Sequence, residues 1–505
     1  MADKDIKTSQ GLPEPPAEIL VAPVVRKIDW KRIFFILLGL GLFLWIYYMP
    51  AWPDAVDPVG KHFPLPKEGK AAIALFALAA IWWVFEVIPI GATAIAIGLF
   101  QVIFAIRPAK DALKDFFDPS VWFIFGSVVI GLAFTKTGLT KRLAVKMLQI
   151  VGEKTSMILL GSLIVVAGLT LVMAHTAAAA TVFPILGAVY ALYGEGDKKT
   201  NFGKSLFMGM AYAAGAGSII TYLGAARGPA AAGMFKEFTG KEMGFFQLPM
   251  YMILIAAVMI FIIWLNFMIF LKPEKKTIPG LKEKVKELSK ELGPMSGPEK
   301  FVIGTVILVV LLMGLQAFVP ALQAIDRAAI MLIGTMIFFL FKILTVKELE
   351  DMPWNIILLF GGAMSIGFCL WKSGGAQWLA IEWLALFKNA PWLIFVLSVA
   401  FFVLVATNFI MNVAAIALSL PISLVVAGYM GVAPEVIVYA SLVTAGQPFL
   451  LLIGAAPNAI AYESGQFSAG EFFKMGIIPS ILLIVVLGAA IYFLWPILGM
   501  PTVLK

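Results

Sequence analysis

The sequence predicts an all-α polytopic membrane protein built from two related halves. Three observations support this fold class: an apolar composition, apolar segments that recur near membrane-spanning length, and an internal repeat. Hydrophobic residues make up 61% of the 505-residue chain and charged residues 13%, whereas soluble proteins average roughly 45–50% apolar and about 25% charged residues. A bundle of about ten to twelve spans fits this length, at roughly 20 residues per span.

The composition also narrows the classes of function. The single cysteine, Cys369, excludes an intrachain disulfide, and the two histidines, His62 and His175, exclude a His-rich metal site. The sequence has no Walker lysine motif, no nucleophile elbow and no metal-ligand cluster, so we expect neither an enzyme nor a resident cofactor. The net charge of +8 agrees with the lysine excess of cytosolic loops in membrane proteins, and we expect the lipid bilayer rather than nucleic acid as the partner.

Charge and proline divide the chain into four expected regions. These are a polar cytosolic tail (1–32), a first membrane half (33–271), a basic cytosolic loop (272–300) and a second membrane half (301–505). The tail holds six basic residues and the loop holds eight lysines, an excess that is typical of cytosolic segments. Within the loop, Leu281–Leu292 has the pattern of a surface helix.

An internal repeat relates the two membrane halves. Four segments recur in the same order at offsets of 230 to 237 residues. The pairs are Phe125-Gly126-Ser127 with Phe360-Gly361-Gly362, Lys136-Thr137-Gly138 with Lys372-Ser373-Gly374, His175-Thr176-Ala177-Ala178 with Asn412-Val413-Ala414-Ala415, and Gly224-Ala225-Ala226 with Gly454-Ala455-Ala456. The alternative is coincidental similarity among alanine-rich helices. Duplicated halves with interrupted apolar segments at matching positions are typical of transporters, and they suggest inverted repeats around a site near the midplane.

Two short stretches that contain polar residues interrupt long apolar segments. They are Met173–Ala177 in the first half and Asn408–Val413 in the second, with Ala174–Thr176 and Met411–Val413 at their centres. Neither has a charged loop beside it, which predicts a re-entrant hairpin whose tip stops inside the bilayer; the alternative is a tight buried turn between helices. Helix N-termini at such a tip present N–H groups and a positive dipole end to an anion, and nearby carbonyls can hold a cation.

Each half also contains a Gly- and Pro-containing interruption, Gly224–Pro229 in the first half and Gly454–Asn458 in the second. Gly together with Pro breaks a helix and frees backbone groups. Arg227 lies in the first interruption and would be costly in lipid, so it should face a cavity, a partner or the interface. Its guanidinium can clamp a carboxylate or sulfate with two parallel hydrogen bonds. The alternatives are that Arg227 extends to a membrane boundary or pairs with an acid.

The residues expected to bind the substrate come from both tips and both interruptions. They are Ala174, His175, Thr176, Arg227, Met411, Asn412, Val413, Ala456, Pro457 and Asn458. Other ionisable residues have structural explanations. Asp326 and Arg327 open a span and are expected to form a surface pair, and Lys136 and Lys372 are expected to anchor hairpin ends at the interface.

At these residues the chain resembles the divalent anion/sodium symporter family of dicarboxylate, citrate and sulfate carriers. That family has a Ser-Asn-Thr triplet at each hairpin tip and a Thr-Pro-Pro-Asn-like break in each half. The segments similar to the family are Gly454–Ile460, Trp354–Gly362 and Trp82–Pro89, and the resemblance runs from Ala71 to Leu498. It implies a homodimeric elevator-type carrier, with a transport domain of hairpins and broken helices and a scaffold of the remaining spans. The chain departs from the family at the triplets, where only Thr176 keeps a hydroxyl.

The resemblance also implies two sodium sites, each made by a hairpin-tip Asn and carbonyls of the facing break. By position these are His175 with Gly224 in the first half, and Asn412 with Thr407 and Gly454 in the second. A neutral imidazole is a poor ligand for a hard cation, which prefers oxygen. The residues therefore favour a sodium site in the second half over one in the first. In the first half, the basic residues His175 and Arg227 can replace the charge of a lost sodium ion.

We therefore predict a secondary active transporter of small anions that works by alternating access, as a multi-pass protein of a bacterial or archaeal inner membrane. Di- or tricarboxylates are the first expected substrates and sulfate or a sulfonate the second, with sodium as the coupling ion or with reduced sodium dependence. If His175 and Arg227 take the place of sodium, the transport rate should depend weakly on sodium and strongly on pH between about 5 and 8. The alternatives are a sodium-independent or proton-linked organic anion exchanger and, from another class, an anion channel.

Overall fold

The computed structural model describes residues 29–57, 60–196, 198–316, 318–384 and 390–504. Most of the expected polar tail (1–32) lies outside the described residues. Within the described part, nine helices are long and apolar enough to cross a membrane, and four more are apolar but shorter. The strands described there, β1 (Ala55–Val56) and β2 (His62–Phe63), form one short antiparallel pair. The predicted all-α membrane fold is confirmed.

The first half consists of single helices, a helical hairpin, a broken helix and a closing helix. The elements before the hairpin are α1 (Trp30–Tyr48), α2 (Lys67–Val84), α3 (Ile90–Ile103), α4 (Ala109–Lys114), the 3-10 turn η1 (Asp115–Phe117), α5 (Pro119–Thr137) and α6 (Leu139–Val151). The hairpin is α7 (Thr155–Leu169) with α8 (His175–Tyr193), the broken helix is α9 (Asn201–Gly217) with α10 (Arg227–Thr239), and the closing helix is α11 (Gln247–Phe270).

The second half follows the same order after α12 (Leu281–Leu292) of the central loop. The elements before its hairpin are α13 (Gly297–Leu315), α14 (Pro320–Gln323), α15 (Arg327–Leu340), α16 (Val346–Glu350), α17 (Trp354–Lys372) and α18 (Gly375–Leu384). The hairpin is α19 (Trp392–Phe409) with α20 (Asn412–Tyr429), and the broken helix is α21 (Pro434–Ala445), η3 (Leu452–Gly454) and α22 (Ala456–Tyr462). The closing helix is α23 (Ala469–Ala489), which continues through a π-helical turn (Ala490–Leu494) into α24 (Trp495–Ile497).

Both predicted hairpins and both predicted helix breaks are present, but the first break begins earlier than its Gly and Pro residues indicate. The apolar segment 206–223 suggested one continuous span, whereas α9 ends at Gly217. The packing explains this end, because a Cβ at Gly217 would lie 2.5 Å from Ala167 Cα of α7. The chain then runs without regular helix to Arg227, so the break is longer than the interruption that the sequence suggested.

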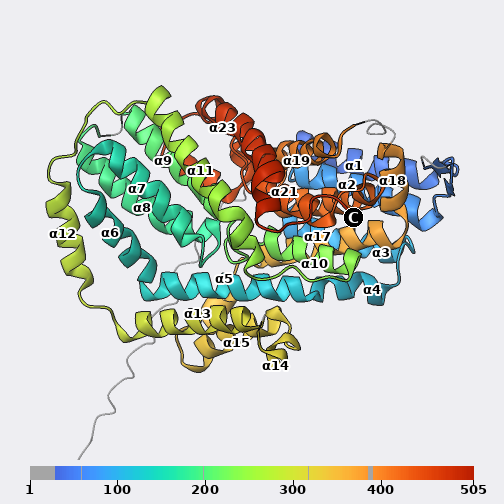
Figure 1. Ribbon diagram of the computed structural model, residues 1–505, viewed down its shortest axis with the longest axis horizontal. Helices are drawn as coiled ribbons and strands as arrows, with labels where there is room; N and C mark the ends of the chain where they lie inside the picture. The colour runs from blue at the N-terminus through green and yellow to red at the C-terminus, as the bar shows by residue number, and fades with distance from the viewer. Residues whose placement is uncertain (1–28, 58–59, 197, 317, 385–389, 505) are drawn as a thin grey trace, which may run out of the picture.

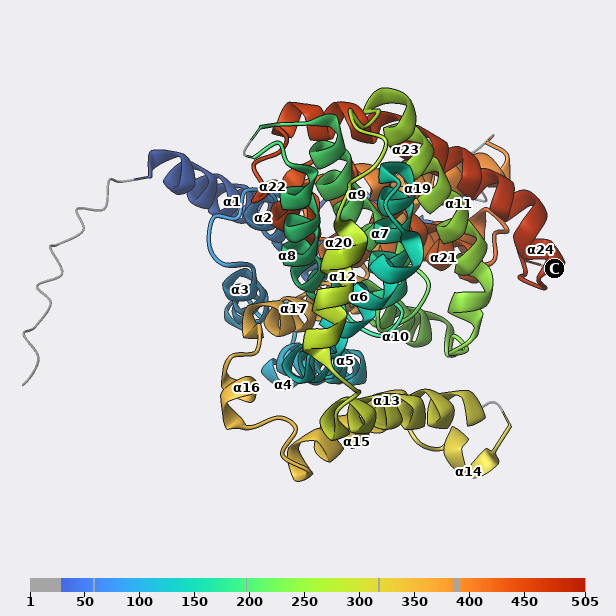
Figure 2. The same ribbon diagram turned by 90° about the vertical axis from the view of Figure 1, so that its left-hand side faces the viewer.

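The long helices are arranged around a buried centre. α17 and α20 are the most buried of the nine candidate spans, and α20 packs against α17, α10 and α21. α5 packs against α13 and α15, which form a layer on one side of the molecule (Figures 1 and 2). At the left edge of Figure 1, α12 packs against α6, with Leu281 and Val285 buried as its amphipathic pattern predicts. The centre therefore brings elements of both halves together.

Three ion pairs involve residues with expected structural roles, and the expected surface pair of Asp326 with Arg327 is not among the ion pairs of the described residues. Asp326 caps α15 by accepting the N–H of Ala328 at 2.8 Å, rather than pairing with its neighbour Arg327, which lies 3.7 Å from Glu242. Lys136 pairs with Glu348, and Lys372 pairs with Glu237 at 2.8 Å. Lysines that were expected to anchor hairpin ends at the interface therefore connect helices that are distant in the sequence.

Candidate functional site

The first hairpin tip is docked onto the break of its own half. α8 begins at His175, which follows Ala174 in an extended conformation with ψ of 138°. The His175 backbone N–H donates to the Gly224 carbonyl oxygen at 2.9 Å, and His175 Nδ1 lies 3.3 Å from the same oxygen. A Cβ at Gly224 would lie 2.7 Å from the Thr170 carbonyl oxygen, so this docking requires a glycine.

The second tip is held by the amide of Asn412, the first residue of α20. The orientation of the amide follows from its neighbours, because one end faces oxygens and the other faces a guanidinium. In this orientation Nδ2 donates toward Gly454 O, Ala445 O and Thr407 Oγ1 at 3.1, 3.2 and 3.0 Å. Oδ1 accepts from Arg227 Nη1 at 3.1 Å. The Thr407 hydroxyl in turn donates to Ala445 O at 2.9 Å.

Arg227, the first residue of α10, carries the buried charge of the site. The residue is 1% exposed, and its Nη2 donates to Ser218 Oγ at 2.8 Å while Nη1 donates to Asn412 Oδ1. None of the ion pairs in the described part of the chain includes Arg227. A buried charge without a counter-ion is unfavourable. An anion beside Arg227 would therefore complete the pairing that the protein leaves open.

Two glycines allow the broken helices of the two halves to cross beside this guanidinium. A Cβ at Gly446 would lie 2.5 Å from Arg227 Nη2, and a Cβ at Gly215 would lie 2.8 Å from the Gly446 carbonyl oxygen. Only residues without a side chain permit so close an approach. A cation from the first half therefore reaches the second half because these two positions are glycines.

A cavity of about 260 Å³ opens between the two tips, and we call it the tip cavity. The predicted residues that line it are Ala174, His175, Thr176, Arg227, Met411, Asn412, Val413, Ala456 and Gly454. Pro457, Asn458, Gly224 and Thr407 do not line it; Asn458 instead donates to two backbone carbonyls of the break at 2.9 and 3.0 Å. Helices α8, α10 and α20 all begin at lining residues, so their free N–H groups and positive dipole ends border the cavity.

Several contributors were not predicted from the sequence. Ser218, Ala445 and Gly446 hold Arg227 and Asn412, and part of the cavity wall comes from one face each of α5 and α17. The runs Gly215–Ser218 and Ala445–Gly446 lie at matching positions of the repeat, and such small residues are a signal for close backbone approach. No sequence signal indicates which face of α5 or α17 meets the cavity.

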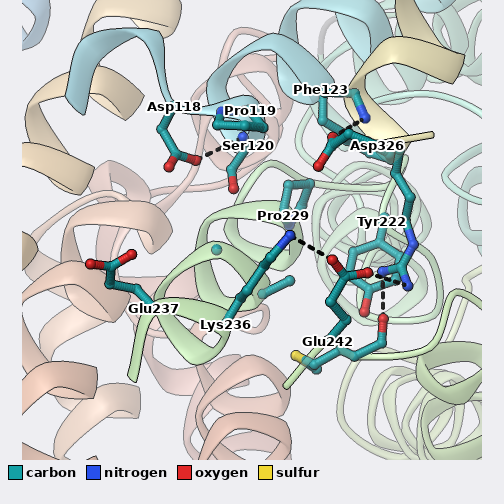
Figure 3. A pocket seen from close by; sticks show the side chains of 15 residues that line it. Asp118, Pro119, Ser120, Phe123, Tyr222, Pro229, Lys236, Glu237, Glu242 and Asp326 are labelled. Atoms are coloured by element: carbon teal, nitrogen blue, oxygen red, sulfur yellow. Dashed lines mark hydrogen bonds and ion pairs between the residues drawn. The ribbon is translucent and has the colours of Figure 1, made fainter. Parts of the chain in front are cut away.

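A second cavity of about 240 Å³ lies between α5, α10 and α15, and its chemistry differs (Figure 3). Its charged lining residues are Asp118, Lys236, Glu237, Glu242, Asp326 and Arg327, so carboxylates outnumber cations. Both cations lie beside Glu242, at 2.5 Å for Lys236 and 3.7 Å for Arg327. This charge balance disfavours an anion, and the tip cavity, which is lined by Arg227 and both hairpin tips, is the candidate substrate site. Tyr222 lines both cavities.

The oxygens that the resemblance assigned to sodium lie around the two tip residues. In the second half, the Asn412 amide lies 3.1 Å from Gly454 O, 3.2 Å from Ala445 O and 3.0 Å from Thr407 Oγ1. In the first half, Gly224 O accepts the N–H of His175. A hard cation needs several oxygens directed at one position. The second half gathers such oxygens around Asn412, whereas in the first half an imidazole lies at the corresponding place.

Comparisons with known proteins place these features in a family. The sequence profile described as "Sodium:sulfate symporter transmembrane region" matches residues 33–501. The sodium-dependent dicarboxylate transporter SdcS of Staphylococcus saprophyticus is 26% identical over 453 residues, covering 86% of this chain and 87% of that protein. SdcS of Staphylococcus aureus (strain bovine RF122 / ET3-1) is 26% identical over 454 residues, with the same coverage.

Two solved structures share the fold. Neisseria gonorrhoeae MtrF, described with a class of antimetabolite efflux pumps, has a TM-score of 0.55 at 16% identity and covers 94% of this chain and 96% of its own. The Alcanivorax borkumensis YdaH transporter has a TM-score of 0.56 at 13% identity and covers 93% and 98%. At these identities the likeness concerns the fold alone. The profile match over most of its length shows that this chain, a multi-pass membrane protein, belongs to the sodium:sulfate symporter family.

Proposed function

We propose that this protein is a secondary active transporter that exchanges small organic anions by alternating access. The observation that carries the proposal is the Arg227 guanidinium, buried beside the tip cavity with no carboxylate partner in the described part of the chain. The N-termini of three helices at the same cavity support an anion as the ligand. Dicarboxylates are the reference substrate, because relatives at 26% identity bear the name of dicarboxylate transporters.

The proposed transport does not need sodium. A sodium ion that binds with the anion leaves with it, whereas Arg227 is part of the chain and keeps its charge in the empty site. Moving an unpaired buried charge is costly, so each reorientation of the site requires a bound anion. This favours exchange of one anion for another. Sodium-coupled symport, as the names of the relatives describe, is the alternative.

Alternating access requires one group of helices to move past another, and replaceable contacts between α10 and its neighbours support such a movement. Glu237 of α10 pairs with Lys372 of α17, and Glu242, just after α10, lies 3.7 Å from Arg327 of α15. Ion pairs with this degree of exposure are weak, at about 0–1 kcal/mol. They can therefore break and re-form as the broken helix moves. The elevator mechanism and the homodimer stay predictions from the resemblance.

Counterflow in proteoliposomes tests the proposal and separates a carrier from a channel. Vesicles with the purified full-length protein are loaded with unlabelled succinate or butanesulfonate, with choline as the cation, and the labelled form of the same anion is added outside. A carrier predicts transient accumulation of label above equilibrium, at a rate that saturates with concentration. Entry without an overshoot would support the channel alternative. Failure of both anions to enter faster than into protein-free vesicles would contradict the proposal.

A further inference from the structure

Most of the wall of the tip cavity is apolar. The wall contributed by α5 and α17 consists mainly of Ile124, Val128, Leu132, Ile356 and Phe360. The first three recur at a spacing of four residues, so α5 presents one apolar face to the cavity. At the second tip, Met411 and Val413 add a thioether and an isopropyl group on either side of Asn412. A substrate in this cavity meets hydrocarbon over most of its surface.

The lining has few other polar side chains, and two of their hydroxyls are occupied. Ser127 Oγ donates to the Leu223 carbonyl oxygen at 3.1 Å, and Thr135 Oγ1 donates to the Gly131 carbonyl oxygen at 3.0 Å. The Tyr222 hydroxyl is buried without a partner in the described part of the chain, and Tyr222 also lines the second cavity (Figure 3). The hydroxyls of Thr176 and Tyr222 carry no charge, and Arg227 is the one Arg or Lys among the described residues of the lining.

This distribution fits one charged group rather than two. A carboxylate or sulfonate can pair with Arg227 and the N–H groups of the tips. A second anionic group on the same molecule would lie against the apolar wall without a cation, and burial of an unpaired charge is strongly unfavourable. A molecule with an apolar remainder would instead replace water along this wall.

The size of the cavity leaves room for that remainder. Its volume of about 260 Å³ is many times the roughly 10–15 Å³ that one water molecule needs on this measure, so it can hold a charged group together with a short hydrocarbon body.

We infer that the substrate is an organic monoanion, with one carboxylate or sulfonate bound at Arg227 and an apolar body in contact with Ile124, Ile356 and Phe360. The inference rests on the proposed function and departs from its reference substrate, a dicarboxylate. It identifies the apolar wall as the part of the site that determines specificity.

A homologous series tests the inference with the purified full-length protein. Binding of n-alkyl sulfonates from methane- to hexanesulfonate is measured by calorimetry beside α,ω-alkanedisulfonates of equal chain length; sulfonates stay ionised and do not cross vesicles as neutral acids. Each methylene should tighten binding roughly fourfold until the chain fills the cavity, since a buried methylene contributes about 0.8 kcal/mol. The second sulfonate should weaken binding at least about tenfold. Tighter binding of the disulfonates, or affinity independent of chain length, would overturn the inference.

One near-isosteric variant adds a test that does not depend on which sulfonates the wild-type protein binds most tightly. Val413→Thr restores a hydroxyl at the second tip, and it should shift the ratio of pentanedisulfonate to pentanesulfonate affinity at least about threefold toward the dianion. Gly428→Ala, at an α20 position with no atom within 4 Å of the added Cβ, is the matched control and should leave the ratio unchanged. An unchanged ratio in Val413→Thr would overturn the role of the wall. A wild-type protein that binds succinate but no monoanion contradicts only this inference, whereas one that binds and exchanges neither contradicts the proposed function.

Discussion

The two hairpin tips occupy matching positions of the repeat but differ in what holds them. The first tip is fixed by one carbonyl, Gly224 O, which faces both the N–H and Nδ1 of His175. The second is fixed by an amide, because Asn412 faces two carbonyls, one hydroxyl and the Arg227 guanidinium. The charge thus originates in the first half, and one group from each half, Ser218 and Asn412, orients it. The difference teaches that the halves are not interchangeable, because the first supplies the cation and the second has an amide at the matching tip.

Replacement of Arg227 should have the largest effect, because it removes the charge that the comparison depends on. Arg227→Ala should weaken anion binding at least about 100-fold, since two charge-assisted hydrogen bonds at about 1.5–3 kcal/mol each are lost. Arg227→Lys should lose about tenfold, because a point charge cannot reproduce the bidentate fork. Calorimetry and counterflow measure both variants. Wild-type affinity in Arg227→Lys would show that the fork is not used.

Removal of each tip side chain in turn compares the halves directly. Asn412→Ala should reduce exchange about 10–100-fold, because it frees the guanidinium and leaves buried oxygens without donors, at about 1–3 kcal/mol for each unsatisfied group. His175→Ala should reduce exchange less than about tenfold, because the backbone N–H still docks the first tip. Initial counterflow rates show which substitution reduces exchange more, once each rate is normalised to the amount of folded protein measured by size-exclusion chromatography. A larger effect at His175 than at Asn412 would reverse the assignment of roles.

Gly446→Ala displaces the guanidinium without changing any polar group. The added Cβ would lie 2.5 Å from Arg227 Nη2, and overpacking of this kind costs about 1–3 kcal/mol. Binding should weaken about tenfold, and the melting temperature should fall because the added Cβ overpacks the site. Gly428→Ala serves again as the control, since its Cβ meets open space. Equal affinities in the two variants would mean that the position of Arg227 does not matter.

The ion pair of Lys136 with Glu348, neither of which lines the tip cavity, provides the baseline and should have the smallest effect. The pKa of the Glu348 carboxyl is lowered to about 2 by hydrogen bonds from Lys136 and Thr345. Because the folded pKa lies below the ordinary value, this interaction stabilises the protein above about pH 4.5 and is lost as the pH falls toward 2. Glu348→Gln should lower the melting temperature slightly at pH 7, and the difference from wild type should shrink below pH 4.5. Anion affinity at pH 7 should be unchanged.

Much of the architecture follows from local sequence features. Interruptions at Ala174–Thr176 and Met411–Val413 predicted the two hairpins, and the amphipathic pattern of Leu281–Leu292 predicted α12. The site is less predictable because its contacts join distant segments. Arg227 reaches Asn412 only because Gly446, in the other half of the chain, has no side chain.

The expected sodium site shows the same limit. Thr407, Asn412 and Gly454 are the residue types that a sodium site requires, and the sequence correctly places them near one another. Whether their oxygens remain free depends on the direction of the Asn412 amide and on a guanidinium from the first half. Neither property has a signature in the local sequence, so this part of the prediction required the folded structure.

Counterflow with sodium replaced by choline at fixed pH tests the central claim most directly, namely that a guanidinium takes the place of a bound cation. The rate of succinate or butanesulfonate exchange should be the same within about twofold in the two salts, because no sodium ion enters the mechanism. Repeating the series between about pH 5 and 8 at fixed sodium separates the proton-linked alternative, in which the rate follows titration of His175. A steep, saturable dependence on sodium with a flat pH profile would contradict the account.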